Sequence, residues 1–381
     1  MHIPVQAKYI LQKLTAAGFE AYFVGGCVRD FLLGNSPSDF DITTNATPEE
    51  TTAVFAADKV IPTGIKHGTV TVIHGGYPFE ITTYRTETVY TDGRHPDTVE
   101  FSRKLSDDLC RRDFTVNAMA MGLGGDVVDL YGGRADLEKG VIRAVGEPRR
   151  RFTEDALRIL RAFRFASKLG FEIEEKTLGA ASELASRLSL VSRERIFAEL
   201  EKLLLGKSAT EVLGVMQERG VFGHIFNSPQ INLAAVHALP NRADIRLASL
   251  LLFDANAKEH LRSLKTSNAF FESVSSIVNA RLPKETDKKT LRHAIYSYGG
   301  KSLLDRALIE GEGEIYTVLC DILENEDCFC IADLKISGAD IARHTALRGK
   351  AIGEKLTEVL FAVFDEKIPN TYDAEIAIIK S

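Results

Sequence analysis

The chain has 381 residues, of which 45% are hydrophobic and 26% are charged. A chain of this length holds two or three domains and a core that needs no disulfide staples, which excludes a disulfide-rich mini-protein. No run of about 18 apolar residues could span a membrane, and the first residues lack the pattern of a signal peptide. With five cysteines, an odd number, we expect a cytoplasmic protein with no membrane partner.

Charge is unevenly distributed along the chain. The net charge of −6 argues against a protein that coats nucleic acid indiscriminately. Between Arg143 and Lys168, however, eight basic residues stand against three acidic ones. A polyanionic ligand is therefore expected to bind this segment.

The first part of the chain has short β-type runs broken by glycines. A helix is expected after Gly26, ending at Gly34, and another at Thr47-Pro48-Glu49-Glu50, a capping box with proline at the first helical position. Thr69–Tyr84 predicts a hairpin that turns at Gly75-Gly76. The predicted strands are Glu20–Val24, Asp39–Thr44, Thr69–His74, Pro78–Tyr84 and Val127–Leu130. This pattern indicates an α+β domain with a small mixed or antiparallel sheet.

From Arg151 onward the periodicity becomes helical. The predicted helices are Glu154–Leu169, Lys176–Ser186, Ser192–Leu205 and Thr210–Arg219, and the remainder of the chain is expected to be all-α. We divide the chain into a head at 1–148, a helical neck at 149–205, and a helical body and tail at 206–381.

Asp39 and Asp41 flank a phenylalanine at the start of a predicted strand. Side chains alternate along a strand, so both carboxylates project from one face, about 7 Å apart, with Phe40 on the other. Such a pair can hold a hard cation, although two solvated acids at an exposed strand end would give the same pattern.

A glycine turn precedes the acidic pair. Tyr22–Asp30 predicts a strand, a turn at Gly25-Gly26 and a helix start, where backbone N–H groups and Arg29 can cradle phosphate. Alone, the turn is as easily explained by conformation. A phosphate cradle followed by a metal-binding acidic pair is what nucleotidyl transfer requires.

At this point the sequence resembles a known family. Gly25–Asp30 and Asp39–Ile42 look like the signature of the bacterial class II tRNA nucleotidyltransferases, or CCA-adding enzymes, of the DNA polymerase beta superfamily. Further matches in the family's order are Arg111–Ala118 (ribose motif), Asp129–Leu137 (hinge motif), Glu154–Arg158 (base-reading motif) and Ser192–Leu200 (supporting motif). Taken alone, Arg111 and Arg112 could equally be a solvated basic pair.

The resemblance implies template-independent addition of CCA to the tRNA 3′ end from CTP and ATP, with Mg²⁺ as cofactor and pyrophosphate as product. It implies a catalytic head followed by a helical neck, body and tail that bind tRNA, in a monomer or homodimer. Asp39 and Asp41 would be the catalytic metal ligands. The implied nucleotide-binding residues are Gly26, Arg29, Arg112, Asp113, Asp155, Arg158, Arg161 and Arg164.

The base-reading motif predicts which bases are accepted, because its side chains offer a donor and an acceptor in a fixed order. On a helical wheel starting at Asp155, the cations from Arg158 to Lys168 share one face, and Asp155 lies 60° from Arg158, so the two can converge on one base. Cytosine and adenine each present an acceptor beside an amino donor, which suits an arginine beside an aspartate. Uracil and guanine would leave buried groups unpaired, at a cost of about 1–3 kcal/mol per group. By the same wheel, Arg164 is expected to meet phosphate or RNA.

Other functions share some of these features. A poly(A) polymerase has the same head motifs, and partial CC-adding or A-adding enzymes are close relatives. A catalytically silent RNA-binding or nucleotide-sensing protein is the non-enzymatic alternative. The polar segment after Tyr84, centred on Asp92, Gly93 and Arg94, resembles the flexible loop that full CCA-adding members have and CC-adding members have shortened.

Overall fold

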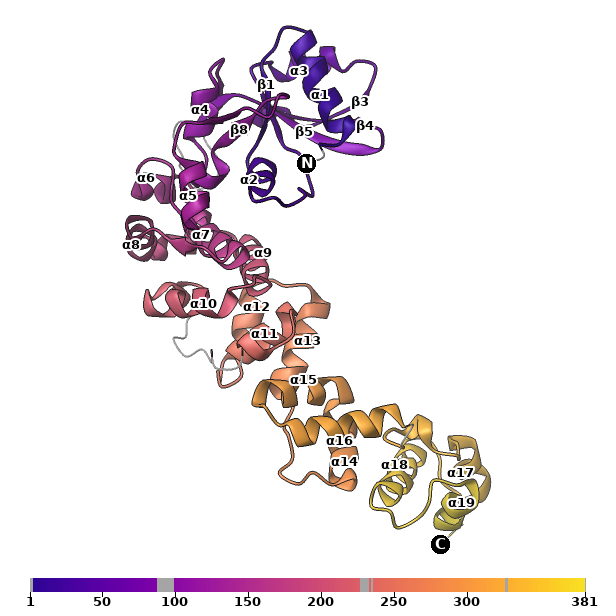
Figure 1. The fold of residues 1–381 in the computed structure, drawn as a ribbon. Helices are drawn as coiled ribbons and strands as arrows, with labels where there is room; N and C mark the ends of the chain where they lie inside the picture. The colour runs from indigo at the N-terminus through magenta and orange to yellow at the C-terminus, as the bar shows by residue number, and fades with distance from the viewer. Residues whose placement is uncertain (1–2, 88–98, 227–232, 234–235, 326–327, 381) are drawn as a thin grey trace. The chain divides into compact units, whose positions relative to one another are not determined.

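The structure is a computed structural model that describes residues 3–87, 99–226, 233, 236–325 and 328–380. The chain forms two compact units, Met1–Pro229 and Gln230–Ser381. Each unit is described by itself, and Figure 1 gives the labels of its helices and strands.

A seven-stranded mixed sheet organises the beginning of the first unit, in the order β3-β4-β5-β2-β1-β8-β9. β2 and β5 are parallel, and every other pair in this sheet is antiparallel. The strands are β1 (Ala21–Val24), β2 (Ile42–Thr44), β3 (Lys59–Gly64), β4 (Thr69–His74), β5 (Tyr77–Thr83), β8 (Met119–Met121) and β9 (Val127–Asp129). The expected α+β class with a mixed sheet is confirmed.

Local signals placed two of these features correctly. β4 and β5 form the predicted hairpin, with His74 opposite Tyr77 across the Gly75-Gly76 turn. Thr47 Oγ1 accepts from Glu50 N at 3.2 Å, while Glu50 Oε2 accepts from Thr47 N at 2.7 Å. This reciprocal capping box starts α3 (Pro48–Val54) at the expected residue.

Helices pack against the sheet and fix its central strands. α1 (Val5–Ala16), which the sequence analysis did not predict, buries Ala7, Ile10, Leu11 and Leu14 at helical spacing and contacts β1 and α3. α2 (Gly26–Leu32) packs on β1 and β8 through Cys27 and Val28. Figure 1 shows α1 and α3 side by side, with α2 at a different part of the sheet. The chain from β1 through α2 to β2 is thereby held rigidly.

The rest of the first unit is mainly helical. Its elements are α4 (Leu105–Cys110), η2 (Thr115–Asn117), α5 (Gly133–Lys139), α6 (Pro148–Glu154), α7 (Leu157–Leu169), α8 (Glu175–Glu183), α9 (Arg193–Leu204) and α10 (Ala209–Glu218). Two small sheets pair β6 (Arg85–Glu87) with β7 (Val99–Phe101) and β10 (Val141–Ile142) with β11 (Glu172–Ile173). α7 packs along α9 and contacts α10, so it forms the centre of this region.

The described residues of the second unit are helical, as expected. The helices are α11 (Ala243–Leu250), α12 (Ala257–Ser263), α13 (Asn268–Asn279), α14 (Lys288–Tyr298), α15 (Gly300–Glu310), α16 (Gly313–Glu324), α17 (Gly338–His344), α18 (Lys350–Phe364) and α19 (Tyr372–Lys380). One core cluster joins α14 to α16, and a second joins α17 to α19. Among the residues the structure describes, no helix has the length and apolar character needed to cross a bilayer.

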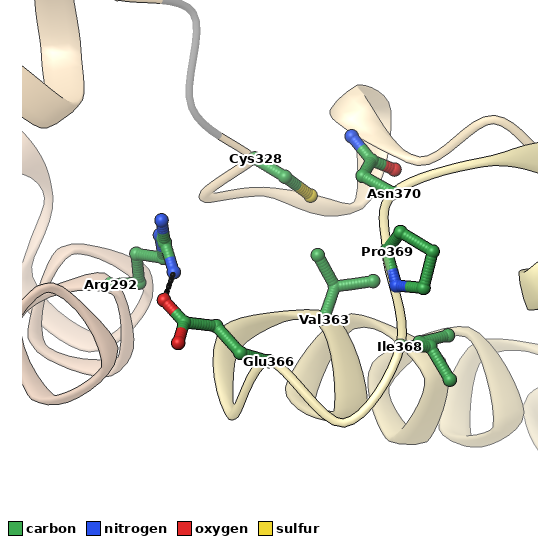
Figure 2. Close-up of a pocket in the computed structure, with 7 residues that line it drawn as sticks. All are labelled: Arg292, Cys328, Val363, Glu366, Ile368, Pro369 and Asn370. Atoms are coloured by element: carbon green, nitrogen blue, oxygen red, sulfur yellow. Dashed lines mark hydrogen bonds and ion pairs between the residues drawn. The ribbon is translucent and has the colours of Figure 1, made fainter.

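A cavity of about 510 Å³ lies within the second unit (Figure 2). Its polar groups include Arg292, which contacts Glu366 at 3.4 Å, and its floor includes Val363 and the buried Cys328. Cys328 also belongs to the core cluster of α17–α19, which gives its thiol a packing role. Glu366 is the one carboxylate among the described residues that line this cavity.

Candidate active site

The acidic pair lies immediately before β2 rather than inside it. The predicted strand Asp39–Thr44 is too long, because β2 begins at Ile42. β1 pairs with β2 only as far as the bond from Val24 N to Asp41 O, 3.0 Å, and then turns away at Gly25. Beyond that bond, β1 has no backbone group left to pair with residues 39 and 40. Aspartate is also rare in strands.

The expected alternation of side chains holds despite the shorter strand. The ring of Phe40 packs edge-on against the fully buried ring of Phe23, with centroids 5.6 Å apart. Asp39 is exposed, and its Oδ1 accepts a 3.0 Å hydrogen bond from Ser38 Oγ. Phe40 therefore anchors the segment and leaves the acidic pair available to a ligand.

Negative charge accumulates around Asp41. Desolvation, followed by repulsion from Asp39 and Glu80, raises the pKa of Asp41 to about 6, against the opposing effect of Arg112. Glu80 was missed by the sequence analysis. The parallel register that pairs Ile42 with Ile81 places it on β5 beside Asp41. The alternation of the strand sequence predicts that Glu80 is exposed between buried Phe79 and Ile81. The sequence does not show that β2, and with it Asp41, lies next to this strand.

The donor set fits Mg²⁺ supplied with its nucleotide. Within the described ranges no group of three or more His, Cys, Asp or Glu side chains is arranged to hold a metal by itself. Asp39 and Asp41 would supply two carboxylate oxygens, and Mg²⁺ usually completes its octahedron with substrate phosphates and water. Desolvation raises the pKa of Asp41 most, and repulsion from Asp39 and Glu80 adds to it, so a bound cation would offset part of this cost.

Arg112 crosses the glycine turn beside the acidic pair. Gly25 has φ +78°, and a Cβ built there would lie 3.1 Å from Arg112 Nη1, so a larger residue would suffer both strain and crowding. Gly26 is the first residue of α2 and leaves ordinary room for a Cβ. Gly25 is thus the glycine that this geometry requires, whereas the sequence analysis had singled out Gly26.

A buried aspartate sets the position of Arg112. Asp108 is fully buried and accepts from Arg112 Nη2 at 3.0 Å, Arg111 Nη2 at 2.6 Å and Thr43 Oγ1 at 3.2 Å. Burial alone would raise the pKa of Asp108, but the two guanidinium groups hold it below its usual value. Because Thr43 belongs to β2, this carboxylate connects the metal-binding segment to the arginine pair. No sequence signal marked it.

Arg29 and Asp113 lie deeper than expected. Arg29, 3% exposed, donates to Asp30 Oδ1 at 2.6 and 2.8 Å and to Asn117 Oδ1 at 2.7 Å, and it faces the ring of Phe165. These bonds join α2 to η2 and α7. A direct contact between Arg29 and triphosphate stays a prediction.

Asp113 forms a two-bond ion pair with Arg161. It accepts from Arg161 Nε and Nη2 at 2.8 and 2.6 Å and from Asn117 Nδ2 at 3.2 Å. Burial would raise the pKa of Asp113, but the charge and hydrogen bonds of Arg161, with help from Asn117, hold it at about 2. Asp113 is expected to contact the sugar of the nucleotide. It would have to do so while its carboxylate stays paired with Arg161 on α7.

The base-reading segment is not one helix. The predicted helix Glu154–Leu169 is interrupted at Asp155, which has extended φ and ψ of −139° and 106° between α6 and α7. Its Oδ1 accepts from Leu157 N at 3.0 Å, a capping bond that starts the new helix. The wheel remains correct within α7, where Ile159, Leu160, Phe163 and Ala166 are buried. It does not apply to Asp155.

Asp155 and Arg158 each have a partner of their own. Asp155 Oδ2 receives a 3.2 Å contact from Arg195 Nη2 on α9. Arg158 donates to Glu154 Oε2 at 2.9 Å and to Arg111 O at 2.8 Å. The structure thus shows them at neighbouring points at the start of α7, joined by the backbone bond from Arg158 N to Asp155 O, 3.0 Å, and with their side chains directed to different partners. Their joint contact with a base stays a prediction.

α9 supplies carboxylates and cations to the same face of α7. Glu199 Oε2 lies 3.0 Å from Arg164 Nε, and Glu199 Oε1 lies 3.9 Å from Arg161 Nη1. Arg164 also stacks over Phe165, 4.0 Å from its centroid. The sequence analysis left the supporting motif out of the site, yet its Arg195 and Glu199 contact three of the predicted nucleotide-binding residues.

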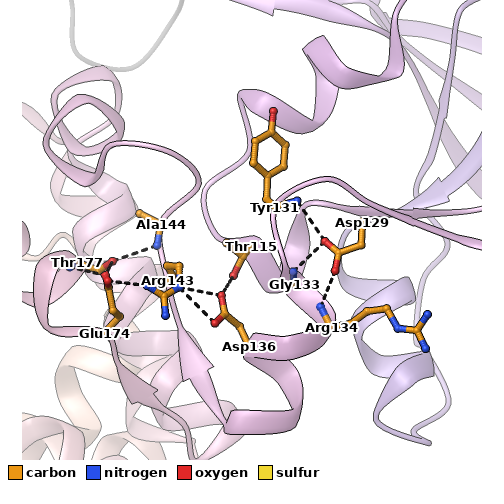
Figure 3. Close-up of polar contacts among 10 residues, drawn as sticks. All are labelled: Thr115, Asp129, Tyr131, Gly133, Arg134, Asp136, Arg143, Ala144, Glu174 and Thr177. Carbon is orange, nitrogen blue, oxygen red and sulfur yellow. Dashed lines mark hydrogen bonds and ion pairs between the residues drawn. The ribbon is translucent and has the colours of Figure 1, made fainter.

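The hinge motif is a network of short polar contacts (Figure 3). Asp129 accepts from the backbone N–H groups of Gly133 and Arg134 at 2.8 and 2.9 Å, which fixes the start of α5. Asp136 accepts from Thr115 Oγ1 at 2.6 Å and from Arg143 Nε at 3.1 Å. These bonds tie the strand end at β9 to η2 and β10. The loop residues Asp92, Gly93 and Arg94 lie outside the described residues.

The structure brings together an acidic pair beside a glycine turn, an arginine across the turn and a cationic helix, the arrangement expected of a nucleotide-transfer site. Comparison with known proteins agrees. Residues 21–143 match a family model described as the poly A polymerase head domain. Residues 170–234 match the model "Probable RNA and SrmB-binding site of polymerase A", and residues 242–379 match domain 2 of tRNA nucleotidyltransferase.

The chain is also similar to named enzymes over nearly its whole length. It is 40% identical to the CCA-adding enzyme of Leuconostoc citreum, covering 97% of this chain and 94% of the relative. It is 40% identical to that of Streptococcus pneumoniae serotype 19F, covering 96% and 94%. The structure of the Bacillus stearothermophilus CCA-adding enzyme in complex with CTP is 32% identical, with a TM-score of 0.79 and 98% and 96% coverage. The chain belongs to the family of CCA-adding enzymes, which are tRNA nucleotidyltransferases.

Proposed function

We propose that this protein completes the tRNA 3′ end by adding C, C and A from CTP and ATP, without a nucleic-acid template. In each step the tRNA 3′-hydroxyl oxygen bonds to the α-phosphorus, the bond from that phosphorus to pyrophosphate breaks, and the hydroxyl proton is lost. The observation that carries the proposal is the placement of Asp39 and Asp41 beside Arg112, whose positive charge opposes the raised pKa of Asp41.

The named relatives support the choice of substrates. A CCA-adding enzyme 32% identical to this chain has been solved with CTP. When bound, Mg²⁺ would neutralise the charge of the leaving pyrophosphate, with Asp39 and Asp41 as its protein ligands. Asp108 would keep Arg112 aimed at the nucleotide, since it holds that guanidinium at 3.0 Å.

Selection of C and A would come from the start of α7. Arg158 donates and Asp155 accepts, the polarity that cytosine and adenine share on their pairing edges. In the structure these groups are satisfied by Glu154, Arg111 O and Arg195. The ring nitrogen of a correct base could replace one acceptor of Arg158, and its amino group could replace Arg195 at Asp155. Uracil or guanine would leave unmatched donors and acceptors. The cytoplasmic location and the choice between monomer and homodimer stay predictions.

Three substrates test the function. Purified protein is offered tRNA lacking CCA, CA or A, with CTP and ATP supplied separately and then together. We expect C addition to the first two and a single A on the third. A long A tail would indicate a poly(A) polymerase, arrest after CC a partial enzyme, and no incorporation a silent binding protein.

A further inference from the structure

A second pocket, of about 520 Å³, lies beside the acidic pair in the first unit. One wall is the segment between α2 and β2, with Asn35, Ser36 and Ser38, and the other includes Lys168 and Lys207. Ser38 donates its 3.0 Å hydrogen bond to Asp39. The wall of the pocket therefore leads directly to the proposed metal ligands.

The pocket carries uncompensated positive charge. The three arginines of α7 each have a carboxylate partner, within 3.0 Å. In the described part of the chain, neither Lys168 nor Lys207 has a carboxylate within 4.0 Å. The pocket's own carboxylate, Asp30, is already paired with Arg29 at 2.6 Å. Two positive charges thus remain for a ligand.

The backbone next to Lys207 is fixed at the end of α7. Ser208 N donates to Ser167 O at 3.1 Å, which fixes the chain beside the end of α7. The stem of Lys207 then lies across Gly170, where an added Cβ would come 2.6 Å from Lys207 Cε. Gly170 has φ +65° as the C-cap of α7, so it ends the helix and makes room for the lysine. Lys168 and Lys207 are both exposed, so their ammonium groups are accessible to an anion.

We propose that this pocket binds the backbone phosphates of the last nucleotides of the RNA acceptor strand and so delivers the 3′-hydroxyl to Asp39 and Asp41. The inference rests on the proposed function and extends it to the position of the second substrate. Lysines neutralise phosphates, while exposed serine hydroxyls and an asparagine suit the oxygens and 2′-hydroxyls of single-stranded RNA. The triphosphate of the incoming nucleotide shares the phosphate chemistry, and the test separates the two sources.

The test measures RNA binding and nucleotide use separately. The variant carries Lys168→Glu and Lys207→Glu. The control carries Lys59→Glu and Lys66→Glu, the same charge change at two exposed lysines on β3 and η1, away from the pocket. Fluorescence anisotropy gives the Kd of labelled tRNA ending in CC across a salt series, and steady-state assays give the KM for CTP on tRNA lacking CCA.

We expect the pocket variant to raise the Kd for tRNA at least tenfold and to reduce the slope of log Kd against log salt by about 1.4, as for two phosphates of a single strand. The KM for CTP should change less than twofold. The loss should persist on tRNA lacking CCA, whose own 3′ end must reach the same carboxylates. It should disappear on tRNA trimmed well into the acceptor stem, and the control should bind like the parent.

Three results would overturn the proposal: an unchanged Kd, an equal loss on trimmed tRNA or in the control, or a raised KM for CTP with unchanged RNA affinity, which would assign the pocket to the triphosphate. Circular dichroism checks folding, and Lys168→Gln with Lys207→Gln replaces the reversal if it misfolds. Since binding is read without turnover, a parent protein that binds tRNA but adds nothing would refute the proposed function and leave this test readable.

Discussion

The ion pair between Asp113 and Arg161 joins the head to α7, and Asp113→Asn should weaken it measurably. Lowering the pKa of Asp113 from 3.8 to about 2 corresponds to about 2.5 kcal/mol of folded-state stabilisation. The asparagine also leaves the Glu199 contact, at 3.9 Å, as the nearest ion pair of Arg161 in the described part of the chain. Because breaking a buried pair costs about 3–5 kcal/mol, we expect a loss of about 3 kcal/mol at pH 7.

The pH dependence has a defined sign. The folded-state pKa of Asp113 lies below its unfolded value, so its contribution is complete above about pH 4 and is lost as pH falls towards 2. The stability difference between parent and Asp113→Asn should therefore be constant from pH 7 to about 4 and shrink below it.

Urea unfolding followed by circular dichroism measures this difference, since the chain has no tryptophan. Hydrogen exchange of the α7 amides shows whether the stability difference arises in the first unit, which contains α7. Asp126→Asn, at an exposed turn, is the matched control. A variant within about 0.5 kcal/mol of the parent at pH 7, or a difference independent of pH below 4, would refute this reasoning.

Three further changes test other parts of the site. Arg158→Ala and Asp155→Ala should each lose discrimination against UTP and GTP in competition assays, whereas lower activity with unchanged nucleotide ratios would place base reading elsewhere. Gly25→Ala should destabilise the fold by about 1–2 kcal/mol and reduce turnover, because a Cβ at φ +78° meets Arg112 Nη1 at 3.1 Å; normal turnover would show that this approach is not needed. Deleting Thr88–His95 should spare C addition and depress A addition, as the family resemblance implies, and equal loss of both would contradict a switching role.

Features with local causes were predictable from the sequence. The capping box at Thr47 and the hairpin at Gly75-Gly76 depend on residues within a few positions of each other, and both formed as expected. The burial of one face of α7 followed from its periodicity in the same way. The break at Asp155 did not, because an aspartate inside a helical pattern can either continue the helix or cap a new one.

Non-local partners explain what the sequence could not show. Glu80 reaches Asp41 only through the parallel register of β2 and β5. Asp108 lies four residues from Arg112 in the sequence, but its link to β2 through Thr43 is non-local. The sequence placed the arginines of α7 on one cationic face but showed none of their carboxylate partners on other elements. The structure pairs them with Asp113 and with Glu199 from α9, which no spacing rule connects to α7.

The central claim, that Asp39 and Asp41 hold the metal for transfer, is tested by Asp39→Asn and Asp41→Asn in single-turnover addition of CMP to tRNA lacking CCA, at saturating CTP and magnesium. Removing one carboxylate ligand should cost several kcal/mol of transition-state stabilisation and slow transfer by about a thousandfold or more, with tRNA affinity and folding unchanged. Transfer by both variants within tenfold of the parent would contradict the account.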